Sequence, residues 1–134
     1  PIALHAPFFG LERDLTVAPD HRLLVWGADA EYLFGAEEVL IEARYLNRFA
    51  SGLPKHRPAT QRYVHVLIGS HVCLSVGGGW GESLYLGDLA DHPARHAMSP
   101  LRRIPSSELP RHTAMVGPEL GGYEAAVLVS SLCA

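Results

Sequence analysis

The sequence predicts an all-β fold of short strands, followed by a C-terminal extension of loops and short helices. Apolar residues alternate with other residues over 64–68 and again over 72–76, which is the period expected of half-buried strands. The chain contains 13 glycines and 10 prolines, and these breakers keep each strand short. Beyond Gly87 the composition changes to histidine, proline, arginine and serine, so loops with one or two short helices are expected there.

Length and composition indicate one folded domain or part of one. The 134 residues are 48% hydrophobic and 19% charged, which is typical of a chain that buries a core. The net charge of -3 supplies no basic field, so neither nucleic acid nor a membrane is expected as a partner. No apolar stretch reaches the roughly 18 residues of a membrane span. No signal peptide is visible, which leaves a cytoplasmic and a secreted location both open.

The cysteines and the first residue each limit what the chain can be. Cys73 and Cys133 are too few for a disulfide framework. The first residue, Pro1, is not a methionine, so a processed or trimmed chain with further sequence upstream is expected.

The N-terminal half contains three predicted strands and one ambiguous stretch. Strands are expected at about 2–6 and 14–18, and a third over 22–27, closed by Gly27. Residues 30–46, "AEYLFGAEEVLIEARYL", fit either one continuous helix or a buried strand followed by a helical turn. The consecutive aliphatic residues 39–41 favour the strand.

The second half starts with a loop and continues with the strongest β pattern. Residues 49–62 are predicted to be a loop, and 43–62 carry five Lys/Arg and no acid, either as a solvated surface or as a contact for an acidic partner. Two strands around Gly69-Ser70 are expected to form a hairpin or a sharply bent strand. A glycine turn at 77–79 follows, then Trp80 as a packing anchor and a last short strand at 83–87. The apolar segment 121–132 is expected to dock as a final helix or strand.

His21 is the first candidate catalytic residue among the eight histidines. It follows Pro19-Asp20 and precedes an aliphatic run, so its backbone is restrained by the proline on one side and by a strand on the other. A general acid or base needs such a fixed position. The alternative is an ordinary polar turn that contains a histidine.

Other histidines and glycines give weaker indications. His71 and Cys73 share a strand face if the strand is regular, which places an imidazole beside a thiol; a half-buried hairpin with a polar face is the structural alternative. His92 and His96 have the spacing of two metal ligands on a helix, but no acidic or cysteine ligand accompanies them at a fixed spacing. The three glycines at 77–79 lack the Lys-Ser/Thr of a phosphate loop, and no G-x-S-x-G elbow occurs.

Taken in order, several segments of the chain resemble the hedgehog/intein (Hint) family, most closely its bacterial branch. These segments are "PIALHAPFFGLERDLTVAPDHRLLV" at 1–25, "AEYLFGAEEVLIEARYL" at 30–46, "YVHVLIGSHVCL" at 63–74, "GGGWGESLYLG" at 77–87 and "YEAAVLVSSL" at 123–132. The resemblance is close over 1–88 and loose beyond. It implies a Hint-like β domain at 1–88, matching the C-terminal portion of the family domain, and a C-terminal extension at 89–134 packed on it.

The resemblance implies a fold and a chemistry. The family fold is an all-β horseshoe, a partial barrel with pseudo-two-fold symmetry. In the family, an N-terminal Cys or Ser attacks the preceding carbonyl, and the resulting thioester or ester is then resolved by water, a thiol or another nucleophile. His21 falls on the family's T-x-x-H histidine, which helps the scissile nitrogen leave as an amine. His71 falls on a later histidine that could assist the second step. Neither a cofactor nor a metal is implied.

This chain departs from the family pattern in three places. Ala18 stands where the motif has a hydroxyl residue, which should weaken orientation of the scissile amide. Glu82-Ser83 replaces the terminal His-Asn pair, so no succinimide can form and at most one-sided cleavage is expected. The nucleophile should lie upstream of this chain, because Pro1 cannot serve and Cys73 lies mid-strand without a motif match.

Three hypotheses follow. The first is an autoprocessing domain whose partner is the upstream segment of its own precursor and which turns over no separate substrate. The second is a catalytically inactive Hint-fold module for binding or structure. The third is a metal-binding β domain that uses some of the histidines. Because a horseshoe without its first strands leaves edges and apolar faces unpaired, a homodimer or retained partner strands are also expected.

Overall fold

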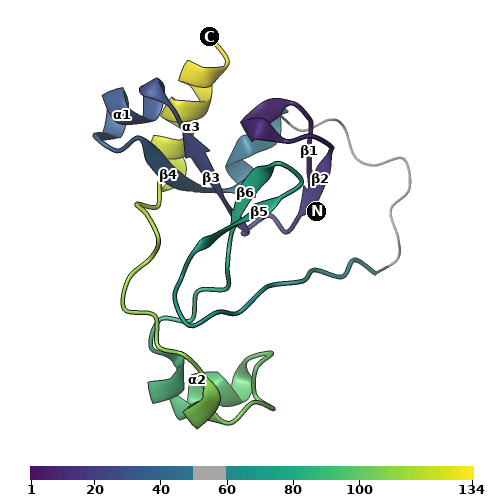
Figure 1. Ribbon diagram of the computed structural model, residues 1–134, viewed down its shortest axis with the longest axis vertical. Helices are drawn as coiled ribbons and strands as arrows, with labels where there is room; N and C mark the ends of the chain where they lie inside the picture. Colours follow the sequence, from purple (N-terminus) through teal and green to yellow (C-terminus); the bar gives the residue numbers. More distant parts are fainter. Residues whose placement is uncertain (50–59) are drawn as a thin grey trace. The chain divides into compact units, whose positions relative to one another are not determined.

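The computed structural model describes residues 1–49 and 60–134 (Figure 1). Most of the predicted loop at 49–62, and with it half of the basic patch, lies outside these residues. Strands (β), α-helices (α) and 3-10 helices (η) follow in the order β1 (Ile2–Leu4), η1 (Phe8–Gly10), β2 (Leu15–Val17), β3 (Arg22–Trp26), α1 (Ala28–Phe34), β4 (Glu38–Glu42), η2 (Ala43–Phe49), β5 (Cys73–Val76), β6 (Gly79–Glu82), η3 (Leu89–Asp91), α2 (Pro93–Met98), η4 (Ser106–Glu108) and α3 (Gly122–Leu132).

The chain divides into two compact units. Unit 1 comprises residues 1–64, 73–82 and 117–134, and unit 2 comprises residues 65–72 and 83–116. All strands lie in unit 1, within the part of the chain that the structure describes.

Unit 1 contains two antiparallel sheets. β1 pairs with β2, and the other four strands form a sheet in the order β4-β3-β6-β5. The prediction of an all-β fold therefore holds in a coarser form: the protein is β-rich, with helices beside two antiparallel sheets. The described strands do not close into a barrel.

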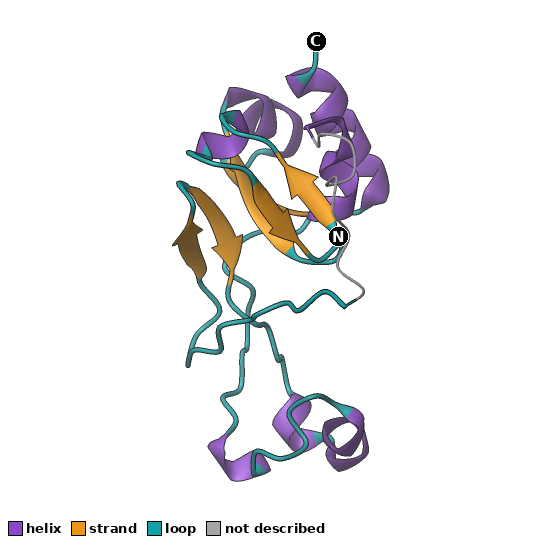
Figure 2. Ribbon diagram, turned by 90° about the vertical axis from the view of Figure 1, so that its right-hand side faces the viewer, coloured by secondary structure: helices purple, strands orange, loops and turns teal. Residues whose placement is uncertain are grey.

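Helices and strands of unit 1 enclose the hydrophobic core. α1 packs against β3, β4 and α3, while α3 also packs against η2 (Figures 1 and 2). Strand β4 is buried at all three of its central positions because it carries aliphatic side chains on both faces. The core also includes residues of β1 and of two loops, and its buried side chains are Leu4, Leu11, Leu23, Val25, Ala30, Val39, Ile41, Ala43, Leu46, Phe49, Leu120, Ala125, Leu128 and Val129.

Several predicted elements are confirmed. Strands lie at 2–4, 15–17 and 22–26, and the ambiguous stretch ends in a buried strand followed by helical turns. The segment at 121–132 is a helix rather than a strand, and short helices follow Gly87. None of the helices in the described residues is long and apolar enough to cross a membrane.

The predicted hairpin around Gly69-Ser70 is wrong. The hairpin formed is β5–β6, and it turns at Gly77 and Gly78, whose φ angles are +59° and +91°. A Cβ at Gly78 would lie 2.5 Å from the carbonyl oxygen of Gly10, so this turn requires glycine. The predicted strands at 64–68 and 83–87 are not strands in the structure. Trp80 is 43% exposed and so is not the predicted packing anchor.

Candidate functional site

His21 stands at the entrance of β3 on a backbone that is bound on both sides. Its own N–H donates to the carbonyl of Ala18 at 3.1 Å, which closes the turn through Pro19-Asp20. The carbonyls of Pro19 and His21 accept hydrogen bonds from the amides of Arg44 and Ala43, at 2.8 and 2.9 Å. The backbone of His21 is therefore restrained by the proline and the strand, as predicted, and also by hydrogen bonds from the start of η2.

Gly81 makes room for the His21 imidazole. Gly81 lies opposite Leu23 in the β3–β6 pairing, and a Cβ built on it would lie 3.1 Å from Nε2 of His21. Such a contact is tighter than nearly all real Cβ contacts. The half-buried His21 ring thus lies against a backbone surface that a side chain would fill.

Ala18 occupies the start of the same turn with a buried methyl group. It is 8% exposed, and its carbonyl forms the turn hydrogen bond without help from a side chain. The turn is therefore closed by backbone atoms alone, and no side-chain hydroxyl stands at this position.

Arg22 joins three segments beside His21. Its Nη1 lies 3.1 Å from Oε2 of Glu82 in β6, and its Nε lies 2.6 Å from Oε1 of Glu119. The backbone N–H of Arg22 also donates to Oε1 of Glu82 at 3.0 Å. Burial opposes the charge of Arg22, but the hydrogen bond to Glu119 and the charges of both glutamates outweigh burial and raise the pKa of the guanidinium.

Cys73 pairs with Glu82 across the β5–β6 hairpin. Burial, with smaller contributions from the charges of Glu82 and Glu38, raises the pKa of the Cys73 thiol. Because the thiolate is the nucleophilic form, these surroundings disfavour Cys73 as a nucleophile, in line with the sequence-based rejection.

His71 lies in unit 2, whereas His21 and Cys73 lie in unit 1. The His71 side chain is buried, and its Nδ1 accepts the N–H of Val116 at 2.9 Å. Its ring packs edge-on against Tyr85, with a centroid distance of 5.1 Å. The predicted strand that would carry His71 and Cys73 on one face starts only at Cys73.

His112 completes an aromatic cluster with His71 and Tyr85. Its ring stacks on Tyr85 at a centroid distance of 5.8 Å and lies 6.3 Å from the His71 ring. Its Nδ1 accepts the N–H of Leu86 at 3.0 Å, so the ring proton is on Nε2, which lies 2.8 Å from the carbonyl oxygen of Ile68. His112 therefore connects three segments of unit 2.

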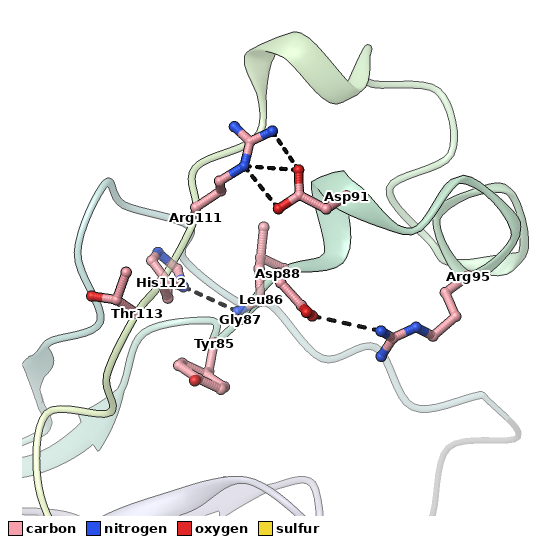
Figure 3. Close-up of a pocket in the computed structure, with 9 residues that line it drawn as sticks. All are labelled: Tyr85, Leu86, Gly87, Asp88, Asp91, Arg95, Arg111, His112 and Thr113. Atoms are coloured by element: carbon pink, nitrogen blue, oxygen red, sulfur yellow. Dashed lines mark hydrogen bonds and ion pairs between the residues drawn. The ribbon is translucent and has the colours of Figure 1, made fainter.

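A polar cavity of about 630 Å³ lies beside His112 in unit 2 (Figure 3). Arg111 forms an ion pair with Asp91 at 2.6 Å, and Arg95 lies 3.5 Å from Asp88. Figure 3 shows that each of these cations points at its own carboxylate rather than at a shared point in the cavity. These opposite charges compensate each other, so they give the cavity no strong preference for a ligand of one sign.

The spacing of His92 and His96 does not produce a metal centre. His92 lies at the start of α2 with Nε2 2.8 Å from Asp88, and His96 Nε2 lies 3.0 Å from the carbonyl oxygen of Leu101. No group of three His, Cys, Asp or Glu side chains in the described residues could hold a metal ion.

The sequence predicts His21 at the mouth of a strand but does not predict Gly81 and Glu82 beside it. The glycine-rich segment 77–87 was a signal for a turn, and nothing in its local pattern indicates which residue faces His21. His112 was missed entirely, because its partners Ile68 and Leu86 lie far from it in sequence.

Comparison with known protein families matches residues 1–88 to the Hint domain. No curated protein and no solved structure matches the chain. The matched region includes the His21 turn, β3 and the β5–β6 hairpin. The chain therefore belongs to the Hint domain family.

Proposed function

We propose that this chain is an autoprocessing domain that cleaves the peptide bond before an upstream cysteine or serine of its own precursor. Hint domains usually act on themselves, and the His21 turn and Gly81 lie within the region matched to this family. We propose the family's horseshoe as the arrangement in which the cleavage takes place.

The proposed reaction begins with an acyl shift. The sulfur or oxygen of the upstream nucleophile bonds to the carbonyl carbon before it, and the carbon–nitrogen bond breaks. The proton of the nucleophile passes to the His21 imidazole, which then protonates the departing nitrogen, so that this nitrogen leaves as an amine. Water or a thiol then attacks the thioester or ester and releases the upstream segment, which regenerates the nucleophile.

One observation carries this proposal: the His21 imidazole has a defined place at the entrance of β3. That place is defined by the turn hydrogen bond to Ala18 and by the hydrogen bond from the amide of Ala43. The ring occupies the space that is left because Gly81 has no side chain. A general acid is effective only when it is held within reach of the atom that it protonates.

Glu82, at the end of β6, and Ser83, directly after it, favour one-sided cleavage over splicing. Glu82 is held by Arg22, and the buried Ser83 Oγ accepts the N–H of Val72 at 3.0 Å. Neither side chain has the amide that forms a succinimide. A role of His71 in the second step stays a prediction, to be tested by a His71→Gln variant.

A second candidate is an inactive Hint module that binds a partner or serves as a structural appendage. The buried methyl group of Ala18 favours it, because the motif hydroxyl that orients the scissile amide is missing. Ala18→Ser adds one oxygen at this place. It should accelerate cleavage in an active domain and change nothing in an inactive one.

The test of the proposed function is intact-mass spectrometry of the protein expressed with its natural upstream residues, with and without added thiol. We expect thiol-accelerated cleavage before an upstream Cys or Ser and its loss in His21→Ala. An unchanged full-length mass under every condition, also in Ala18→Ser, would favour the inactive module.

A further inference from the structure

We propose that Glu82 is a positioning residue for His21, because its carboxylate holds the peptide unit that follows His21 against β6. This inference rests on the proposed function of His21 as proton donor. It assigns a role to a residue at which the chain departs from the family pattern.

The peptide unit between His21 and Arg22 is bound on both of its sides. Its carbonyl, which belongs to His21, accepts the N–H of Ala43 at 2.9 Å. Its N–H, which belongs to Arg22, donates to Oε1 of Glu82 at 3.0 Å. Because this peptide plane is held by η2 on one side and by β6 on the other, the direction of the Cα–Cβ bond of His21 is restricted.

Arg22 in turn holds the Glu82 carboxylate. Its Nη1 contacts Oε1 and Oε2 of Glu82 at 3.2 and 3.1 Å. The Glu82 side chain is only 8% exposed, so few water molecules compete for its oxygens. A charge-assisted hydrogen bond to a backbone amide in such surroundings is stronger than one at the surface.

β6 also contacts the imidazole of His21 directly, through Gly81. Gly81 precedes Glu82 directly, and its backbone lies against Nε2 of His21. One short segment of β6 therefore acts on His21 twice: Gly81 gives the ring its space, and Glu82 fixes the peptide to which the residue belongs.

Glu119 provides a matched control for Glu82. It also pairs with Arg22, through Nε at 2.6 Å, but the hydrogen bonds that the structure gives it involve the side chain of Arg22 and not its backbone. Removing either carboxylate loses an ion pair of the same arginine. Only the loss of Glu82 frees the peptide unit beside His21.

The experiment compares Glu82→Ala, Glu82→Gln and Glu119→Ala in the protein with its upstream residues, by single-turnover cleavage in thiol. We expect Glu82→Ala to slow cleavage by about 10- to 100-fold, which is the effect of a misplaced catalytic group. Glu82→Gln keeps an oxygen for the Arg22 amide and should restore most of the rate. Glu119→Ala should stay within about two-fold of the wild type. Equal rates for the two alanine variants, or no rescue by Glu82→Gln, would overturn the inference.

A second readout separates this inference from the proposed function. The ring signals of His21 in an NMR spectrum should move or broaden in Glu82→Ala and stay in place in Glu119→Ala, whether or not the wild type cleaves. If the wild type does not cleave and these signals still respond to Glu82 alone, the proposed function fails and the positioning stands. If the signals respond to neither variant, the positioning fails. Thermal unfolding of each variant confirms that the folded protein is being compared.

Discussion

At the scale of single residues, His112 shows how a buried imidazole stabilises a segment without an extensive apolar core. Its two ring nitrogens serve two backbone groups, and its own N–H donates to the carbonyl of Gly87 at 2.9 Å. Buried polar groups must be paired, and here one side chain pairs groups from two separate segments.

His112→Ala should therefore destabilise unit 2. It leaves the N–H of Leu86 and the carbonyl of Ile68 unpaired, at about 1–3 kcal/mol for each group, so a loss of about 2–6 kcal/mol is expected. This loss in the free energy of unfolding can be measured by urea unfolding, with NMR signals of unit 2 as the probe. The control is His92→Ala, which removes only an exposed pair with Asp88 and should change the free energy of unfolding far less than His112→Ala does. Equal losses in both variants would contradict the structural role of His112.

Gly81→Ala should displace the His21 ring. The added Cβ would lie 3.1 Å from Nε2 of His21, so the imidazole has to shift by a few tenths of an ångström, and the cleavage rate of an active domain should fall several-fold. Gly69→Ala is the control, because a Cβ there meets no described atom within 4 Å. The His21 ring signals in NMR report the displacement directly. Unmoved signals in Gly81→Ala would contradict the contact.

The place of His21 could be predicted from the sequence, while that of its partners could not. Pro19-Asp20 followed by an aliphatic run is a local pattern, and such a pattern specifies a turn that leads into a strand. The contact with Gly81 and the hydrogen bond to Glu82 depend on the pairing of β3 with β6, across 60 positions in the case of Arg22 and Glu82. Register of this kind depends on the whole sheet.

At the scale of elements, the misplaced hairpin has a specific cause. The apolar alternation at 64–68 predicted a half-buried strand, yet Val64 is 87% exposed and the segment packs no face onto the core. Gly77 and Gly78 instead supply the positive φ angles that a tight turn needs, so the hairpin forms there and not at Gly69-Ser70. Alternation indicates a strand only where a partner strand is available.

Asp91, at the end of η3, should make the stability of unit 2 depend on pH. The hydrogen bond from Arg111, opposed by burial and aided by the charges of Arg111 and His92, lowers the pKa of Asp91 from its ordinary value of 3.8. A lowered folded-state pKa stabilises the fold above the unfolded value, and this contribution disappears as the pH falls through the folded value. Asp91→Asn should thus be less stable than the wild type at about pH 7, and the two should converge as the pH falls through the lowered pKa of Asp91.

Urea unfolding of unit 2 at several pH values measures this difference. Arg111→Gln removes the same ion pair from the other side and should reproduce the effect of Asp91→Asn. A stability difference between Asp91→Asn and the wild type that stays constant down to the lowest pH would contradict the assignment.

At the scale of the whole molecule, the two units are stabilised in different ways. The hydrophobic core cluster lies in unit 1, while the buried polar residues of the described chain, His71, Ser83 and His112, all lie in unit 2. A small unit buries little apolar surface, so hydrogen bonds to buried backbone carry more of its stability. A composition of 48% hydrophobic residues could not reveal this division, because it averages over both units.

Exposed apolar residues predict that the chain associates with a second copy of itself. Val64, Val66 and Ile68 are all exposed on one extended segment, and β5 forms the edge of the four-stranded sheet. Exposed apolar segments and open edges favour strand addition. Sedimentation or light scattering should show a concentration-dependent dimer that is weakened by Val64→Thr with Val66→Thr. Tyr32→Ser, on the exposed face of α1, is the control. A monomer at every concentration would refute the dimer.

The acyl shift assisted by His21 is tested most directly by trapping the acyl intermediate with hydroxylamine. The protein with its natural upstream residues is incubated with hydroxylamine, and the released segment is analysed by mass spectrometry. We expect a hydroxamate at the new C-terminus, because hydroxylamine attacks a thioester or ester far faster than an amide, and we expect no product in His21→Ala. A released segment that ends in a carboxylate even at saturating hydroxylamine, or an intact precursor throughout, would contradict an acyl shift assisted by His21.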